Sequence, residues 1–187
     1  MEIIPAFVSF VLLLFQYFNR KEYKDPVILP NITLIIPVYN SSQTLAGCLR
    51  SITESNYNLD AITVMLVNNC SRDNSFDVFT WCQEQFPQLY MQWTNAKQGK
   101  SKALNMALYN SRGKYIINID SDGELHPDAL RNIVKCFEEH SDIDAITGVV
   151  LINPDQVEET RRPFLKLLRR TEFFEYCQAF LAGRNLQ

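Results

Sequence analysis

Between residues 31 and 155 the chain alternates short apolar runs with segments of helical periodicity. The run at 32–38 is nearly continuous in β-branched and aliphatic residues, which is typical of a strand covered on both faces. The strands are predicted at 32–38, 62–67, 90–94, 115–119 and 143–152, and the helices at 45–55, 75–86, 100–109 and 127–139. This alternation predicts an α/β fold: a doubly wound, mostly parallel sheet with right-handed crossovers and flanking helices.

Length and composition narrow the possible functions. The 187 residues suffice for one domain with a sizeable core and hardly for two. A net charge of -3 with 21% charged residues is ordinary for a globular protein, so we predict no nucleic-acid partner. The 5 cysteines are scattered and form no Cys-x-x-Cys pair, which favours reduced thiols in a cytosolic compartment over a disulfide framework or a zinc site.

The first 20 residues are predicted to form a membrane-anchor helix. Residues 3–18 are almost entirely apolar, although this run is just short of the roughly 17–25 residues that span a bilayer. Arg20, Lys21 and Lys24 follow the run, so the positive-inside tendency places the rest of the chain in the cytoplasm. A core or amphipathic helix is the alternative. Residues 21–30 are the predicted linker to the domain at 31–155.

The tail at 156–187 has a different character. Basic residues between 161 and 170 are interleaved with aromatic and aliphatic residues at helical spacing. This pattern is typical of an amphipathic helix that lies on a membrane surface, and a helix that caps the sheet explains it equally well. Together the two ends of the chain predict a location at the cell membrane, with the domain facing the cytoplasm.

Two carboxylates, Asp120 and Asp122, directly follow the predicted strand at 115–119, which we expect to be buried. Open α/β sheets bind ligands at this end of their strands. The alternate spacing lets both side chains approach one cation, and Gly123 supplies backbone freedom for the turn. Carboxylate oxygens suit Mg²⁺ or Mn²⁺, so Asp120 and Asp122 are the predicted metal ligands. A solvated Asp-Ser-Asp turn without a metal is the alternative.

Three other strand-to-helix junctions are unusually polar and should lie at the same edge of the sheet. Tyr39 and Asn40 follow the first predicted strand, and a long polar loop at 68–75 follows the second. The third junction, at 95–102, resembles half of a phosphate-binding P-loop, but Thr94 stands where the first glycine is required. A glycine and lysines at a helix start still favour a diphosphate. The four junctions together predict a site for a nucleoside diphosphate with its metal.

These junctions also resemble the ordered signatures of a known family. They read Ile-Ile-Pro-Val-Tyr-Asn at 35–40, Asn-Asn-Cys-Ser-Arg-Asp at 68–73, Gly-Lys-Ser-Lys-Ala-Leu-Asn at 99–105 and Asp-Ser-Asp-Gly at 120–123. As a set they are similar to the motifs of family 2 glycosyltransferases with the GT-A fold, and the apolar start and basic tail are similar to membrane-bound polysaccharide synthases. The resemblance implies a nucleotide-sugar donor, often a UDP-sugar, and a metal cofactor, Mg²⁺ or Mn²⁺.

The resemblance also implies roles for individual residues. Tyr39 would stack on the base, Asn68 would contact the base or ribose, and Lys100 would lie near the nucleotide. Asp120 would face the ribose or diphosphate, and Asp122 would bind the metal. The full set of implied donor-binding residues is Pro37, Tyr39, Asn40, Asn68, Asn69, Asp73, Gly99, Lys100 and Asp120.

The sequence departs from the family pattern in two places. Asn68 and Asn69 replace an acidic pair, which removes a charge but keeps hydrogen-bonding groups. The family's catalytic base, an Asp in a later acidic motif, is not found up to Gln187, and neither is the Gln-x-x-Arg-Trp motif of the processive synthases. We therefore expect the chain to be the donor-binding half of a longer enzyme, with weak or absent transfer activity on its own.

The resemblance thus predicts a glycosyltransferase that acts in cell-surface polysaccharide synthesis and transfers a sugar to a glycan or lipid-linked acceptor. A non-catalytic, membrane-associated subunit that binds nucleotide-sugars or other proteins is the first alternative, and a sugar nucleotidyltransferase is the second. A dinucleotide-dependent dehydrogenase is disfavoured, because no Gly-x-Gly-x-x-Gly follows the first predicted strand.

Overall fold

The computed structural model describes residues 28–148 together with positions 8, 11, 15 and 26. The chain divides into two compact units, one at 23–146 and the other made of 1–22 and 147–187, and the fold below is that of the first. The predicted anchor helix at 1–20 and the predicted amphipathic helix at 156–187 lie outside the described residues, apart from positions 8, 11 and 15. Within the described part, no helix has the length and apolar character needed to cross a membrane.

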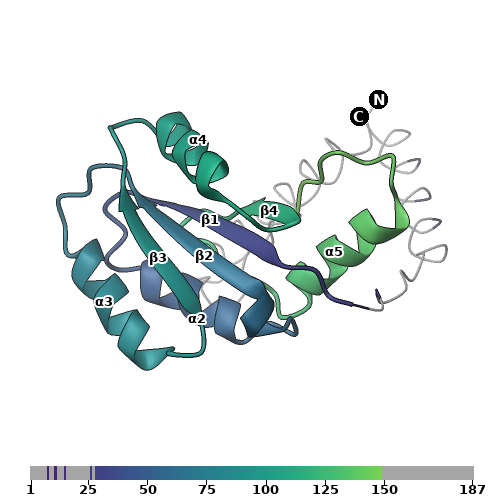
Figure 1. Ribbon diagram of the computed structural model, residues 1–187, viewed down its shortest axis with the longest axis horizontal. Coiled ribbons are helices and arrows are strands. Elements are labelled where there is room, and N and C mark those ends of the chain that lie inside the picture. The colour runs from purple at the N-terminus through teal and green to yellow at the C-terminus, as the bar shows by residue number, and fades with distance from the viewer. Residues whose placement is uncertain (1–7, 9–10, 12–14, 16–25, 27, 149–187) are drawn as a thin grey trace, which may run out of the picture. The chain divides into compact units, whose positions relative to one another are not determined.

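The centre of the domain is a four-stranded sheet, and all of its neighbouring strands are parallel (Figure 1). Its strands are β1 (Ile32–Val38), β2 (Ile62–Asn68), β3 (Tyr90–Asn95) and β4 (Tyr115–Asn118). Their order is β3-β2-β1-β4, and Ile32 of β1 pairs with Ile62 of β2 on one side and Tyr115 of β4 on the other. The predicted parallel α/β sheet is therefore confirmed.

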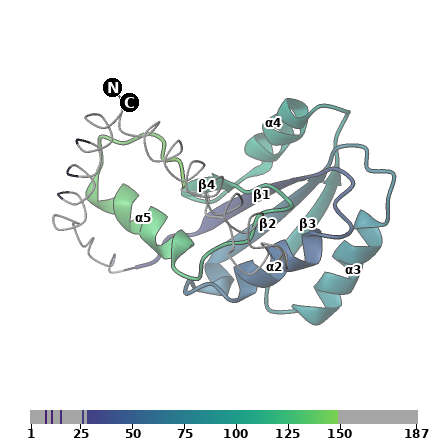
Figure 2. The ribbon, with the colours of Figure 1, turned by 180° about the vertical axis from the view of Figure 1, so that it is seen from behind.

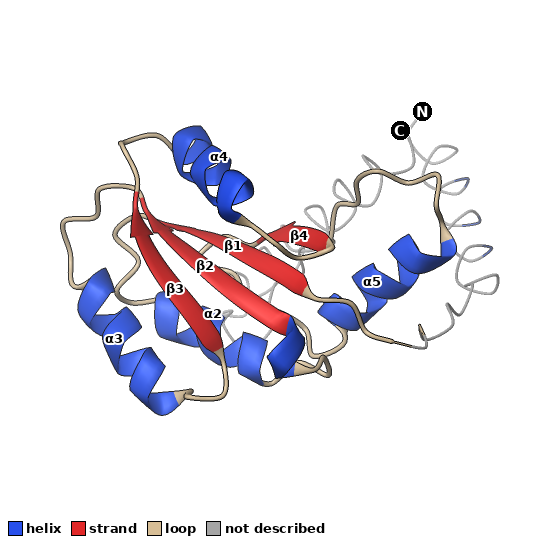
Figure 3. Ribbon diagram, viewed as in Figure 1, coloured by secondary structure: helices blue, strands red, loops and turns tan. Residues whose placement is uncertain are grey.

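Helices cover both faces of the sheet (Figures 1, 2 and 3). The α-helices are α2 (Leu45–Thr53), α3 (Ser75–Gln85), α4 (Lys100–Asn110) and α5 (Ala129–Glu139), and a short 3₁₀ turn, η1 (Leu59–Ala61), precedes β2. Helices α2 and α3 lie on one face and α4 lies on the opposite face, as both ribbon views show. This arrangement is the doubly wound one expected for strands joined by helical crossovers.

Two apolar clusters hold these layers together. The larger one joins α2 and α3 to the sheet, with Leu34 and Leu66 from the strands and Leu49 from α2 each fully buried. The smaller one places Ala103 and Ala107 of α4 against the opposite face. Because alanine side chains are small, α4 can approach the sheet closely.

The strand order contains a switch in direction. The chain places β2 and then β3 on one side of β1, and then places β4 on the other side. In open α/β sheets such a switch leaves a crevice at the carboxyl ends of the two strands, and ligands bind there. The loops after β1 and β4 therefore flank the expected binding position.

The expectation that the strand before Asp120 is buried is wrong. In the described part β4 is an edge strand, and its residues alternate between half-buried and exposed, with Ile116 43% exposed. Helix α5 packs beside it, where Tyr115 stacks on Phe137 with ring centroids 4.9 Å apart. An apolar run indicates a strand, but its coverage depends on neighbours that the run does not specify.

Two further boundaries differ from the predictions. Helix α5 begins at Ala129 rather than at Pro127, because the Pro127 carbonyl accepts a hydrogen bond from the Asn56 backbone N–H at 2.8 Å. The strand predicted at 143–152 is not formed over 143–148, and its remainder lies outside the described residues. Asp144 and Gly148 disfavour a strand there, and no described strand pairs with this segment.

Candidate ligand-binding site at the carboxyl edge of the sheet

The loop after β1 is fastened to the loop after β2 through Asn40. This residue has a φ of 50°, a left-handed conformation that asparagine adopts more readily than most residues. Its backbone N–H donates to Ser71 Oγ at 3.1 Å, and its Oδ1 accepts from the Arg72 backbone N–H at 2.8 Å. The turn leaves Tyr39 53% exposed, so its ring is open to a ligand.

Ser41 connects three of the loops at this edge. Its backbone N–H donates to Ser75 Oγ at 2.8 Å, and its hydroxyl oxygen lies 2.7 Å from Ser121 Oγ in the acidic turn. Ser41 and Ser75 are both buried, so the bond between them is shielded from water, whereas the bond to Ser121 is partly buried. The bond to Ser121 spans the switch point between β1 and β4 and positions the acidic turn against the first loop.

Asp73 completes this network from the loop after β2. Its carboxylate accepts hydrogen bonds from the Ser42 N–H at 2.8 Å, the Ser75 hydroxyl at 2.6 Å and the Ser75 N–H at 3.2 Å. Partial burial acts to raise the pKa of Asp73, but the hydrogen bonds from Ser75 and Ser42 outweigh it and lower the pKa to about 2. The predicted ligand residue Asp73 therefore has three protein donors on its two oxygens.

The two amides that replace the acidic pair also bind protein groups. Asn68 Oδ1 accepts from the Ser71 N–H at 2.8 Å, and Asn68 Nδ2 donates to Asn95 Oδ1 at 2.9 Å. Asn69 Oδ1 accepts from the Gly99 N–H at 2.6 Å. Asn68, at the end of β2, thus bonds to the end of β3, and Asn69, in the loop after β2, bonds to the loop after β3. Asn68 needs both its acceptor and its donor, which an aspartate could not supply.

The first turn of α4 brings a cation to the acidic turn. Gly99 caps this helix with a φ of 130°, a conformation that side chains rarely adopt. Lys100 is the first helical residue, and its Nζ lies 2.6 Å from Asp120 Oδ1. Both side chains are 56% exposed, so the ion pair lies at the surface of the site.

The acidic turn presents a second carboxylate that the described residues leave unpaired. The Gly123 N–H donates to the Asp120 carbonyl at 3.0 Å and closes the turn, while Asp122 is exposed and receives no hydrogen bond or ion pair from the described part of the chain. Beneath the turn, burial and then the charges of Asp122, Glu124 and Asp120 raise the pKa of the Cys48 thiol to about 12. Cys48 is therefore held as a buried thiol, and the three carboxylates add to the effect of its burial.

The donor set of this turn fits a hard divalent cation. Asp120 and Asp122 supply carboxylate oxygens, which Mg²⁺ and Mn²⁺ prefer. Within residues 28–148 there is no cluster of three or more His, Cys, Asp or Glu side chains that could hold a metal. Two carboxylates leave coordination positions for water and for phosphate oxygens, which is the usual environment of Mg²⁺ at a nucleotide.

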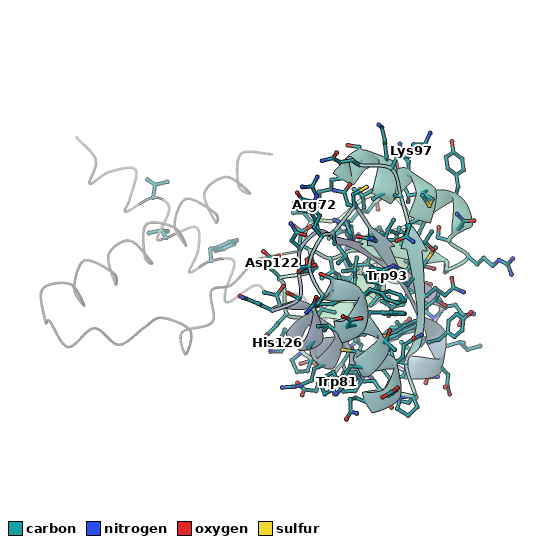
Figure 4. The ribbon with its side chains drawn as sticks, turned by 90° about the vertical axis from the view of Figure 1, so that its left-hand side faces the viewer. Arg72, Trp81, Trp93, Lys97, Asp122 and His126 are labelled. Atoms are coloured by element: carbon teal, nitrogen blue, oxygen red, sulfur yellow. The ribbon has the colours of Figure 1, made fainter. Side chains whose placement is uncertain are left out.

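An open depression of about 530 Å³ lies beside the loops after β1 and β2. Its lining residues are Asn40, Ser42, Gln43, Thr44, Arg72 and Asp73. Figure 4 looks onto the edge where the strands end and labels Arg72, Lys97 and Asp122 there. Of the predicted donor-binding residues, Asn40 and Asp73 line this depression. Pro37 is buried within β1.

Sequence reasoning missed Ser41, Ser75 and Ser121 as site residues. No pattern marks them, because the hydrogen bonds that join them cross 34 and 80 residues of chain. Arg72 lies within the motif at 68–73, whose pattern predicts no role for it, and the structure places it in the wall of the depression. Only the strand order shows which of these loops meet.

A parallel α/β domain with polar loops gathered at a switch point is the architecture of nucleotide-binding domains. The chain belongs to the glycosyl transferase family 2, whose sequence model matches residues 33–183. This membership agrees with the resemblance carried by the four motifs.

Known relatives show both the likeness and its extent. An uncharacterized glycosyltransferase, YibD of Escherichia coli, is 28% identical over 96 residues, which cover 51% of this chain and 27% of YibD. The uncharacterized glycosyltransferase alr2836 of Nostoc is 31% identical over 107 residues, which cover 57% of this chain and 33% of the relative. The chain thus matches about a third or less of these relatives.

Solved structures of other proteins are similar to this chain in fold. The mannosyltransferase PcManGT of Pyrobaculum calidifontis, solved with GDP-Man and Mn²⁺, superposes with a TM-score of 0.58 at 27% identity, covering 72% of this chain and 42% of that one. Staphylococcus aureus TarS in complex with UDP-GlcNAc gives a TM-score of 0.54 at 20% identity, covering 68% and 38%. The domain therefore has a GT-A-like fold.

Proposed function

We propose that this chain binds the donor of a metal-dependent glycosyltransferase. The donor is a nucleotide-sugar, with a UDP-sugar as the first choice, and the acceptor is a glycan or a lipid-linked sugar in cell-surface polysaccharide synthesis. One observation carries the proposal: the exposed Asp122 carboxylate lies in the same turn as the Lys100–Asp120 ion pair, at the switch point of the sheet. Such a place combines groups for a cation with a group for phosphate.

Three of the four loops have a role in this proposal. The exposed Tyr39 ring offers a surface for the base, and Lys100 at the start of α4 offers a charge for the diphosphate. Asp120 and Asp122 would hold the Mg²⁺ or Mn²⁺ ion. A bound cation would stabilise the negative charge that develops on the leaving diphosphate.

The proposal assigns no general base to the described residues. An inverting transfer needs a carboxylate that removes the proton of the acceptor hydroxyl. Asp120 is paired with Lys100, and Asp73 already accepts three hydrogen bonds, so neither is placed for that step. We therefore propose that the chain supports donor binding and needs further groups for turnover.

The relatives support this class of ligand. PcManGT was solved with GDP-Man and TarS with UDP-GlcNAc, so the fold accommodates donors with different bases. TarS of Staphylococcus aureus is named as a poly(ribitol-phosphate) β-N-acetylglucosaminyltransferase, a polymer-modifying activity. A place at the membrane, with the domain facing the cytoplasm, is part of the proposal and rests on the apolar N-terminal run and the basic tail.

Calorimetry with UDP, ADP and GDP, each with and without Mn²⁺, tests the proposal on the detergent-solubilised chain. We expect UDP to bind more tightly when Mn²⁺ is present, because the cation links the diphosphate to Asp122. Asp122→Asn should abolish the Mn²⁺-dependent part, whereas Asp142→Asn, at a side chain 84% exposed beyond α5, should not. If no nucleotide binds, a non-catalytic interaction subunit becomes the better explanation.

A further inference from the structure

The Lys100–Asp120 ion pair places a protein cation on one of the two proposed metal ligands. We propose that Lys100 is an internal competitor for the divalent cation. Its ammonium group neutralises Asp120 in the ligand-free protein and passes to the diphosphate when nucleotide and cation bind. This inference rests on the proposed function and adds a specific prediction: Lys100 opposes the binding of the metal alone and favours the binding of the metal with nucleotide.

The geometry of the pair supports the competition. Nζ of Lys100 lies 2.6 Å from Asp120 Oδ1, at direct hydrogen-bonding distance. A divalent cation on the same carboxylate would lie within a few ångströms of the ammonium group, and two positive charges at that separation repel each other. The free cation must therefore displace Lys100 or bind beside it, and either event weakens its affinity.

The position of Lys100 supplies its second partner. It is the first residue of α4, and the N-terminus of an α-helix attracts anions through its unpaired N–H groups and its dipole. A lysine is a compact charge on a flexible stem, so its ammonium group can change partners without movement of the helix. A diphosphate at this place would give the Lys100 ammonium group a new anionic partner when it leaves the Asp120 carboxylate.

A second ion pair in the domain, between Lys114 and Glu138, is held in place by a third residue. Lys114 and Glu138 also lie 2.6 Å apart, with side chains 55% and 28% exposed. Glu138 accepts a further hydrogen bond from the Tyr115 hydroxyl at 2.8 Å, so this pair has a third member that holds it between β4 and α5. The described residues give the Asp120 carboxylate no partner other than Lys100. Lys114 is therefore a matched control.

The proposal implies coupling between the two ligands. If Lys100 passes from Asp120 to the diphosphate, then nucleotide raises the affinity for Mn²⁺, and Mn²⁺ raises the affinity for nucleotide by the same factor. Removal of the Lys100 charge should therefore reduce both the effect of nucleotide on the Mn²⁺ affinity and the effect of Mn²⁺ on the nucleotide affinity. The measurement needs only equilibrium binding and no sugar transfer.

The test compares the wild type with Lys100→Met and Lys114→Met, each as the full chain. Electron paramagnetic resonance of free Mn²⁺ gives the affinity for the metal alone, and calorimetry gives the affinities for UDP and for uridine in the presence of Mn²⁺. We expect Lys100→Met to bind Mn²⁺ alone about 3- to 5-fold more tightly. We expect it to bind UDP about tenfold more weakly, with uridine binding unchanged. Lys114→Met should match the wild type in all three.

Two results would overturn the inference. Equal Mn²⁺ affinity of the wild type and Lys100→Met would show that Lys100 does not compete for the metal, and equal UDP affinity would show that it does not contact the phosphates. A different result separates the proposed function from this inference. If the wild type binds Mn²⁺ but no nucleotide, the donor site is refuted, and the comparison with Mn²⁺ alone still decides whether Lys100 competes.

Discussion

The hydroxyl oxygens of Ser41 and Ser121 lie 2.7 Å apart across the switch point of the sheet, although the two residues are 80 positions apart in the chain. Ser41 is in turn held by the Ser75 hydroxyl, and that hydroxyl donates to Asp73. A line of hydrogen bonds thus runs from a carboxylate beside α3 to the turn that carries Asp122.

Ser41→Ala should loosen this turn. The substitution removes the only hydroxyl that the described residues offer to Ser121 Oγ, so the free energy of unfolding should fall by about 1–2 kcal/mol. Mn²⁺-dependent UDP binding should weaken several-fold because the acidic turn loses a support. Urea unfolding and calorimetry measure the two effects. Ser111→Ala is the control, because among the described residues the Ser111 hydroxyl bonds only to the Leu108 carbonyl. Equal UDP affinity of all three proteins would contradict the role of Ser41.

Asn68→Asp should destabilise the domain, and Asn69→Asp should not. A carboxylate at 68 could not donate to Asn95 Oδ1, and two acceptor oxygens would face each other in place of the 2.9 Å hydrogen bond. The Asn69 side chain acts toward Gly99 only as an acceptor, a role that a carboxylate keeps. We expect the first variant to lose about 1–2 kcal/mol of unfolding free energy.

Urea unfolding at pH 7 compares these two asparagine variants directly. They introduce the same charge at neighbouring positions, so a general charge effect would act on both alike. Similar losses in the two variants would show that the hydrogen-bond direction at Asn68 is not what matters. A stable Asn68→Asp variant would also reopen the question of why this chain departs from the family's acidic pair.

Asp73 should make the stability of the domain depend on pH under acidic conditions. Its pKa falls from 3.8 to about 2 on folding, since the hydrogen bonds from Ser75 and Ser42 outweigh the effect of burial. A lowered folded-state pKa gives stabilisation that is present above the unfolded pKa of about 4 and is lost as the pH falls toward 2. The difference in unfolding free energy between wild type and Asp73→Asn should therefore shrink from pH 5 to pH 2. A constant difference would contradict this.

Gly113→Ala should disrupt the entry to β4. An added Cβ would lie 2.5 Å from the Thr33 backbone nitrogen and 2.7 Å from the Ile32 carbonyl carbon, and backbone atoms cannot rotate away. We expect a loss of about 1–3 kcal/mol in unfolding free energy. Gly148→Ala is the control, since in the described part of the chain no atom beyond its chain neighbours lies within 4 Å of its added Cβ, and its stability should stay within about 0.5 kcal/mol of wild type. Equal stabilities would refute the predicted clash.

The sequence was sufficient for most of the fold because buried parallel strands have a strong pattern. The run at Ile32–Val38 is apolar at every position but Thr33, and the structure buries all seven residues. Helix α4 was also predictable from Ala103 and Ala107, which share one face and pack on the sheet. The boundary of α5 was missed because a tertiary hydrogen bond to Pro127 decided it.

The candidate site was predictable only in part. The ends of the strands are visible in the sequence, and they locate Asp120, Asp122 and Lys100 at one edge. The partners of these residues are not visible, because each depends on which loops meet in space. Asn68 illustrates this limit: its residue type suggested a ligand contact, and the structure gives its side chain two protein partners.

The network around Ser41 also has a consequence for how the domain folds. Its hydrogen bonds join residues separated by 31, 34 and 80 positions, and closing long loops is slow because chain entropy must be lost first. A nascent chain that has just completed β3 has none of the residues from 115 to 123 to place beside β1. The ability to bind a ligand at this edge is therefore acquired late in folding. A nucleotide that binds there would stabilise only the fully folded domain.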